Sequence, residues 1–316
     1  MKIEIPASLK AEIPQTLLGR IMSATPIVMT VIATMLAGLA SSEMTKAQYD
    51  RSLAAQQQSK AGDQWSFFQA KRLRSALQRN TLDLLQAANE IHPFDPAALK
   101  QSLVTADSGS SDKLAALLAS DAGQSALACL QKGELPAASG DATLAPEVKT
   151  ALDAIENLRP ETEIAALLAK VSDKLIVETL MAAKARSDAF DATTKPLNQV
   201  IEAVESALQR PGGAGVLHRD FIVARVRFAA QRYDTEARLN QVIASLYELQ
   251  VRKNNLSAGR HHGRSQRFFY GMLGAQLAVI IATFAVAARQ RNLLWTLAAA
   301  AGVTALLFAG YVYWYV

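Results

Sequence analysis

The sequence predicts an all-α membrane protein with three transmembrane helices, two long antiparallel, coiled-coil-like helical arms and a helical middle region. Three observations predict this class. Residues 21–42, 268–288 and 292–316 contain no Asp, Glu, Lys, Arg or His, and each window is long enough to cross a bilayer as an α-helix. Alanine, the strongest helix former, makes up about a fifth of the 316 residues. Long stretches between the windows contain no proline, which would interrupt a helix.

The second and third windows are joined only by Arg289, Gln290 and Arg291, and this spacing predicts a membrane hairpin rather than a pair of core helices. The first window contains several Ser and Thr residues and follows the cations Lys2, Lys10 and Arg20. A cleaved signal peptide is therefore an alternative for it, with small residues near Gly38 as the cleavage site. The long segment before the window, residues 1–20, favours a retained span.

Small residues recur at four-residue spacing within the windows and predict close packing between membrane helices. These residues are Thr30, Thr34 and Gly38 in the first window, Gly271 and Ala275 in the second, and Ala301, Ala305 and Ala309 in the third.

The positive charges argue for two orientations. The positive-inside rule gives most weight to short loops, so the N-terminal segment and the 289–291 hairpin are expected in the cytoplasm. The region between the first two spans would then lie outside. Cations flanking the second span between residues 252 and 267 favour the reverse orientation, but long domains translocate largely regardless of charge.

The arms are predicted at 43–91, ending at His92 and Pro93, and at 216–267, leading into the second span. Both are tethered to the membrane at opposite chain ends, so they are expected to run antiparallel and to pair. The middle region, 92–215, reads as short helices and loops without a fixed-period repeat. Within it, Pro160 is expected to begin a helix reaching Ala192, and Pro196 to begin the next.

The sequence offers no catalytic constellation. It has no P-loop, no HExxH, no GxSxG and no paired-cysteine site, so we expect no enzymatic activity, cofactor or metal. Cys129 is the single cysteine and is expected to be a small core residue. His261 and His262 are adjacent, and neighbouring positions on a helix do not face one ligand.

Two segments have unusual composition. The first, the aromatic-basic segment, is either a packing cluster between the arms or a partner or oligomer surface with its tryptophan as anchor. The second, the basic collar, either contacts lipid headgroups or an acidic partner, or is simply solvated. The aromatic-basic segment comprises Asp63, Gln64, Trp65, Phe68, Gln69, Lys71 and Arg72; the basic collar comprises Arg252, Lys253, Arg260, Arg264 and Arg267.

The net charge of +5 belongs to one end of the chain. No acidic residue follows Glu248, and seven cations do, so the rest of the chain is slightly acidic. Because the cations lie beside predicted spans and no recognition motif is present, nucleic-acid binding is not expected.

Several of these residues resemble a bacterial domain-of-unknown-function family. They are the run 62–65 (Gly-Asp-Gln-Trp), the run 68–71 (Phe-Gln-Ala-Lys), Gln276, and the Arg-Gln-Arg turn before Trp295. The resemblance covers about 20–90 and 216–316, and 92–215 is longer than the family would lead us to expect, as an insertion would be. It implies a helical inner-membrane protein with its arms outside the cytoplasm, and it implies no activity.

We therefore expect a non-enzymatic protein of the bacterial inner membrane that acts as a self-associating scaffold or as an accessory subunit. Its expected partners are membrane lipids, further copies of itself and another subunit of a membrane complex. Two alternatives stay open. One is a sensor that transmits movement through its arms, and the other is an oligomeric channel or transporter component lined by Thr30, Thr34 and Gln276.

Overall fold

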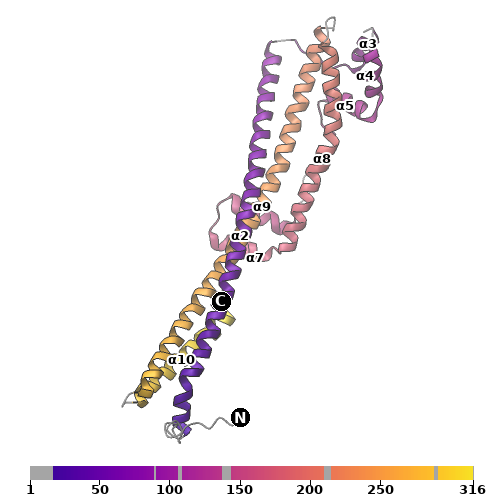
Figure 1. Cartoon of the computed structure of the whole chain (residues 1–316). Helices are drawn as coiled ribbons and strands as arrows, with labels where there is room; N and C mark the ends of the chain where they lie inside the picture. The colour runs from indigo at the N-terminus through magenta and orange to yellow at the C-terminus, as the bar shows by residue number, and fades with distance from the viewer. Residues whose placement is uncertain are drawn as a thin grey trace, which may run out of the picture. The chain divides into compact units, whose positions relative to one another are not determined.

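The computed structural model describes residues 17–88, 90–105, 109–136, 144–209, 215–287 and 291–315. Within these ranges the structure contains helices and no strand, so the predicted all-α class is confirmed (Figure 1). The helices are α2 (Leu17–Ala88), α3 (Pro96–Thr105), α4 (Gly109–Ala119), α5 (Asp121–Lys132), α6 (Pro146–Glu156), α7 (Glu161–Lys170), α8 (Asp173–Leu208), α9 (Gly215–Ala287) and α10 (Arg291–Tyr315). The predicted cytoplasmic cations Lys2, Lys10 and Arg289 lie outside the described residues.

Helices α2 and α9 each combine a predicted span and a predicted arm in one uninterrupted helix. Helix α2 has 72 residues and α9 has 73. The only proline inside α2 is Pro26, and the helix ends at Ala88, shortly before the predicted stop at Pro93. Such lengths follow from the near absence of helix breakers, because each added residue extends a helix that has already nucleated.

The chain divides into two compact units. Unit 1 comprises residues 1–55 and 252–316, and unit 2 comprises residues 56–251. Helices α2 and α9 contribute to both units.

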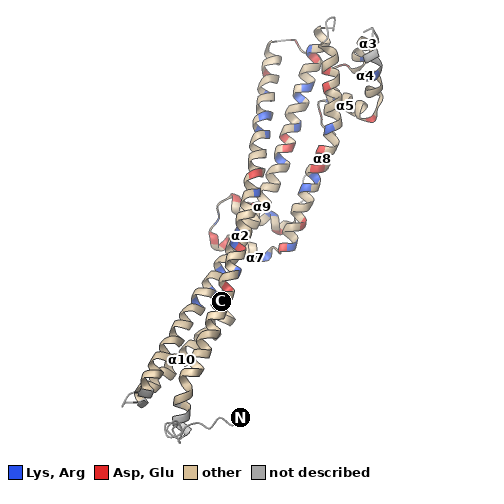
Figure 2. Ribbon diagram, viewed as in Figure 1, with Lys and Arg blue, Asp and Glu red and all other residues tan. Residues whose placement is uncertain are grey.

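Unit 1 holds the apolar segments of α2, α9 and α10. Each of these helices contains a stretch long and apolar enough to cross a membrane, within Ser23–Ala88, Gly215–Ala285 and Leu293–Tyr315. Only 28%, 33% and 17% of these stretches are buried by the rest of the protein. Figure 2 shows that α10 and the adjoining parts of α2 and α9 carry almost no charge. Such large uncovered apolar surfaces are compatible with a membrane protein.

The three apolar segments meet through small side chains, but the first predicted packing face is not used for contacts within the chain. Thr30, Thr34 and Gly38 are exposed, and nothing lies near a Cβ placed on Gly38. The buried face of α2 is offset from them and consists of Met29, Ala33, Leu36 and Ala40. The predicted threonines instead bond to their own helix: Thr30 Oγ1 donates to the Pro26 carbonyl at 2.8 Å and Thr34 Oγ1 to that of Thr30 at 2.9 Å.

On α9 and α10 the small residues lie closer to the contact surface. Ala275 and Ala305 are buried, and Ala301 and Ala309 are half-buried. A Cβ on Gly271 would lie 3.4 Å from the Leu36 side chain and 3.9 Å from the Ala305 carbonyl oxygen. Gly271 therefore lies where α2 and α10 both approach α9, which is the close helix approach that small residues permit.

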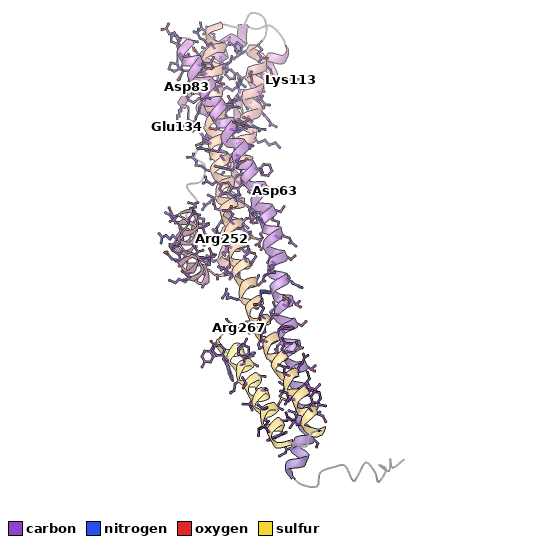
Figure 3. All side chains as sticks on the ribbon, turned by 90° about the vertical axis from the view of Figure 1, so that its left-hand side faces the viewer. Asp63, Asp83, Lys113, Glu134, Arg252 and Arg267 are labelled. Carbon is purple, nitrogen blue, oxygen red and sulfur yellow. The ribbon has the colours of Figure 1, made fainter. Side chains whose placement is uncertain are left out.

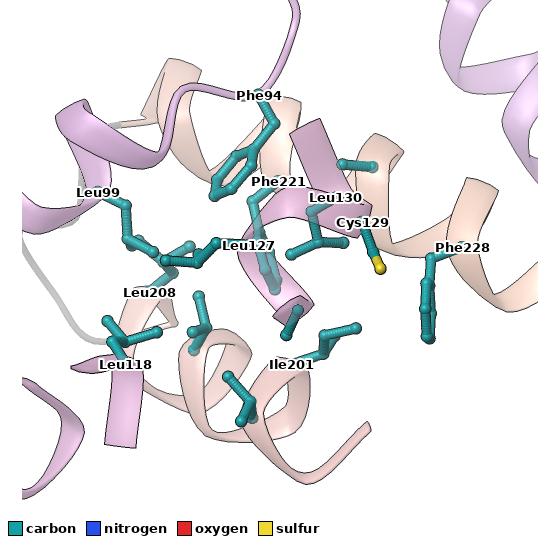
Figure 4. Packing of buried hydrophobic residues seen from close by; sticks show 14 of the residues in the cluster. Phe94, Leu99, Leu118, Leu127, Cys129, Leu130, Ile201, Leu208, Phe221 and Phe228 are labelled. Carbon is teal, nitrogen blue, oxygen red and sulfur yellow. The ribbon is translucent and has the colours of Figure 1, made fainter. Parts of the chain in front are cut away.

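Unit 2 has a hydrophobic core built from α3, α4, α5, α8 and α9 (Figure 4). Phe221 and Phe228 of α9 are fully buried there, and Phe94 packs edge-on against Phe221 with ring centroids 5.7 Å apart. Cys129 belongs to this core, and burial raises the pKa of its thiol despite the opposing charge of Lys132. The predicted core role of the cysteine is confirmed.

The middle of the chain departs from the predicted helix boundaries at two points. The helix expected from Pro160 to Ala192 is divided into α7 and α8, because Ser172 caps α8 by accepting a hydrogen bond from the Leu175 amide at 3.2 Å. Pro196 does not begin a helix but lies inside α8. Burial of Thr194 and Leu197 on either side of it offsets the hydrogen bond that proline removes.

A seven-residue pattern of small side chains organises the buried face of α2. Alanine recurs every seventh residue at positions 33, 40, 47, 54 and 61, and all five are between 0% and 7% exposed. The same spacing continues through half-buried Phe68 to buried Ser75. Helix α9 has a matching series of buried small residues at 230, 237, 244, 251, 258 and 265. A seven-residue period keeps one face of a helix against its partner, and alanine lets the two backbones come close.

Two hydrogen bonds define the antiparallel register of these helices, one in each unit. In unit 1, Ser265 Oγ of α9 donates to the Ala40 carbonyl of α2 at 2.7 Å. In unit 2, Ser75 Oγ of α2 donates to the Ala230 carbonyl of α9 at 2.9 Å. Each serine occupies a position of its alanine series, so its hydroxyl can reach the other helix's backbone only if the helices are close together.

Candidate functional site

A series of polar and charged side chains lies along the contact between α2 and α9 in unit 2. We call them the polar ladder, made up of Trp65, Lys71, Arg72 and Ser75 on α2 and of Asp234, Glu236 and Glu248 on α9. Trp65 Nε1 donates to Glu248 Oε1 at 2.8 Å, and Arg72 pairs with Asp234 at 2.5 Å. Lys71 pairs with Glu236. Both acidic side chains in these two ion pairs are largely buried, at 12% and 9% exposed.

An aromatic cluster lies beside these ion pairs. Trp65 and Phe68 pack edge to face with centroids 5.4 Å apart, one helical turn from each other. The ring of Tyr233 lies within 6 Å of three cations: Lys71 at 5.4 Å, Arg74 at 5.8 Å and Arg232 at 4.7 Å. Cations that lie over aromatic faces or pair with buried carboxylates make favourable contacts, and here these contacts connect α2 to α9.

The structure brings together only part of the aromatic-basic segment. The aromatic cluster and the ion pairs include Trp65, Phe68, Lys71 and Arg72. Asp63 and Gln69 are exposed. The Gln64 Oε1 atom is buried without a hydrogen-bond partner among the described residues. This geometry matches the packing interpretation for Trp65, whose indole N–H is already bonded within the chain. A partner surface stays a prediction for the exposed members.

The basic collar lies on α9 in unit 1, where Arg252 and Arg267 mark its two ends (Figure 3). Arg260 is exposed, whereas the other four collar residues are half-buried. Contact of the collar with lipid headgroups or an acidic partner stays a prediction.

A second polar contact in unit 1 was missed from the sequence. Glu43 of α2 is 8% exposed, and its Oε2 atom lies 2.6 Å from His261 Nδ1 of α9. Its other oxygen accepts a hydrogen bond from Lys46 at 2.7 Å. The position of Glu43 in the sequence could have revealed this contact, because Glu43 lies between Ala40 and Ala47 on the buried face of α2. His261 is therefore a partner in the contact between α2 and α9.

The pKa of Glu43 is lowered. Burial is the largest influence and raises it, but the hydrogen bonds and charges of Lys46 and His261 together outweigh burial. A carboxyl whose pKa is lowered by folding stabilises the protein above its ordinary pKa, and that contribution is lost as the pH falls through the folded value.

We therefore predict that Glu43→Gln lowers the melting temperature of the full chain in detergent near neutral pH, and that the difference from wild type shrinks below about pH 4. Thermal unfolding followed by circular dichroism across this range measures it. Glu178→Gln, at a 60% exposed side chain on α8, is the matched control and should change neither quantity. A difference between Glu43→Gln and wild type that stays constant from pH 7 to pH 3 would contradict the prediction.

Comparison with known families gives one match. Residues 21–119 match the model of a family described as a domain of unknown function, DUF4337. The match contains α2 from residue 21 onward, α3 and α4, so it extends into the region 92–215 that the sequence suggested as an insertion. It is consistent with the expected resemblance to an uncharacterised family. No curated protein and no solved structure matches the chain.

Proposed function

We propose that this chain is a non-enzymatic, membrane-anchored scaffold, or an accessory subunit of a membrane complex, that self-associates. The observation that carries the proposal is the apolar surface of unit 1. At most a third of any of its three apolar stretches is covered by protein, and two of them continue as α2 and α9 without a break. A lipid environment would cover this surface, and the continuous helices would carry the anchor's position into unit 2.

The polar ladder supports a structural role for the arms. Its ion pairs, indole hydrogen bond and serine hydrogen bond all join α2 to α9, and the sequence carries no recognised catalytic motif. Side chains that hold two helices in register are expected in a structural support rather than in an active site.

We further propose a bacterial inner-membrane location, with the N-terminal segment and the 289–291 hairpin in the cytoplasm. The short hairpin with two arginines supports this orientation. A Gln290→Cys variant should resist a membrane-impermeant thiol reagent applied to intact spheroplasts and should react after lysis. Labelling before lysis would reverse the assignment.

Self-association is tested on the full chain extracted from membranes in lipid-preserving polymer particles. We predict a protein mass that is a multiple of 34.0 kDa, or a stoichiometric companion protein, by native mass spectrometry. The protein should also stay in the membrane pellet after alkaline extraction. A 34.0 kDa species with no companion would overturn the scaffold proposal. Release by alkali would overturn membrane anchoring.

A further inference from the structure

The outer face of α2 in unit 2 carries a second apolar series, which nothing in the described chain covers. Its members recur at alternating steps of four and three residues, which is the spacing of a helix seam. We call it the outer stripe: Ser66, Ala70, Leu73, Leu77, Asn80, Leu84 and Ala87. All seven residues are exposed, and the three leucines are 62%, 54% and 71% exposed.

The outer stripe lies on the side of α2 away from α9. Ser75, which bonds to the Ala230 carbonyl, marks the inner side and is 2% exposed. In Figure 3 the part of α2 between the labelled Asp63 and Asp83 faces the viewer, with α9 behind it. In Figure 1, α9 lies on one side of this part of α2, and no described helix lies on the opposite side.

The stripe contains no charged residue. The cations of this segment of α2 occupy other positions of the helix and contact α9. Lys71 pairs with Glu236, and Arg72 and Arg79 both approach Asp234, at 2.5 and 3.5 Å. Arg74 lies over the Tyr233 ring. The same contacts that form the polar ladder therefore leave an uncharged, leucine-containing seam on the opposite face.

We propose that the occupant of the outer stripe is the outer stripe of a second copy of this chain, paired parallel and in register. The inference rests on the proposed membrane anchoring, because copies inserted in one bilayer have the same orientation and their α2 helices then run in the same direction. A parallel two-fold pair places each stripe residue against its own equivalent, so a heptad seam is complementary to itself.

The size of the stripe favours an anchored copy over a soluble partner. The stripe is about 33 Å long, and a contact one helix wide would cover about 300 Å² on each copy. Stable interfaces between freely diffusing proteins cover about 800 Å² on each partner. Two copies confined to one membrane have a raised effective concentration, which compensates for the small contact area. A soluble partner is not confined in this way and would gain no such compensation.

Asn80 specifies the register. It is the one amide among the leucines and alanines of the stripe, and in the parallel, in-register pair it meets the second copy's equivalent amide. A single polar residue in such a seam favours the register in which the two amides can hydrogen-bond to each other, because any other register buries them unpaired.

Disulfide formation in native membranes tests this pairing. Ala70→Cys and Leu84→Cys occupy equivalent stripe positions 14 residues apart, and Met181→Cys on α8, where the side chain is 66% exposed, is the matched control. Wild type, whose Cys129 is buried, supplies the background. With copper-phenanthroline oxidation we expect both stripe variants to form at least about ten times more dimer than the control. Adding Leu77→Glu should reduce that dimer about tenfold, because it buries unpaired carboxylates in the seam.

The outcomes separate this inference from the scaffold proposal. Dimer at both stripe positions supports the parallel pairing. Dimer from only one variant, or only from a mixture of the two variants, indicates an antiparallel or shifted pair and overturns it. If neither stripe variant exceeds the control while native mass spectrometry still shows an oligomer, the inference fails and the scaffold proposal stands. A monomer in both experiments overturns both.

Discussion

Replacing Lys71 with glutamate is expected to reduce the free energy of unfolding by about 3 kcal/mol, the cost of leaving a mostly buried charge without its partner. Glu236 is 9% exposed and is held by Lys71 from α2 and by Arg232 from its own helix at 3.5 Å. The variant would place a second carboxylate against it. One of the three cations over the Tyr233 ring would be lost as well. For a chain of this size, the melting temperature should fall by about 6–12 °C.

Thermal unfolding of the full chain in detergent, followed by circular dichroism, measures this effect. Lys60→Glu makes the same charge change at an exposed position of the same helix and should shift the free energy by less than about 0.5 kcal/mol. The swapped double variant Lys71→Glu with Glu236→Lys should recover part of the loss, because the pair is restored while Arg232 loses its acceptor. Equal melting temperatures for the Lys60 and Lys71 variants would show that the ion pair contributes nothing.

Enlarging Ala61 to leucine is expected to cost about 1–3 kcal/mol, because the added side chain has no space between α2 and α9. Ala61 is 0% exposed. In the register set by Ser75 and the Ala230 carbonyl, it lies opposite Ala244, which is also 0% exposed. The larger side chain would separate the helices and weaken the Trp65–Glu248 hydrogen bond one turn away.

The control for this variant is the same substitution at Ala70, nine residues along the same helix. Ala70 is exposed on the outer stripe, so Ala70→Leu should leave the free energy of unfolding of the single chain within about 0.5 kcal/mol of wild type. It should increase the amount of dimer formed by Leu84→Cys in membranes. If Ala61→Leu melts at the wild-type temperature, the helices are not closely packed at this position.

Much of the architecture could be predicted from local properties of the sequence. The uncharged windows, the rarity of proline and the high alanine content together indicate long helices with apolar ends, and α2, α9 and α10 have this character. Local reasoning was wrong where a boundary depends on distant contacts. Pro196 lies inside α8 because core packing on both sides supports the helix, and no local signal reports that packing.

The sequence indicated the candidate site only through the unusual composition of one segment. The run from Asp63 to Arg72 is recognisably rich in aromatic and basic residues, but its partners Asp234, Glu236 and Glu248 lie more than 160 residues away. Glu43 and His261 are 218 residues apart along the chain. Pairing over such separations depends on the register of α2 against α9, which no single segment specifies.

The three uncharged windows, the basic end of the chain and the all-helical class follow from the sequence by itself, because length, charge and helix propensity act within a segment. Only the tertiary structure decided which face of each helix is used. It turned the alanine series of α2 and the cations Lys71 and Arg72 toward α9, and it left Thr30 and Thr34 exposed. The physical reason is that α2 carries several faces of similar apolar character, and only the close approach of a second helix, with its carboxylates and carbonyls, distinguishes among them.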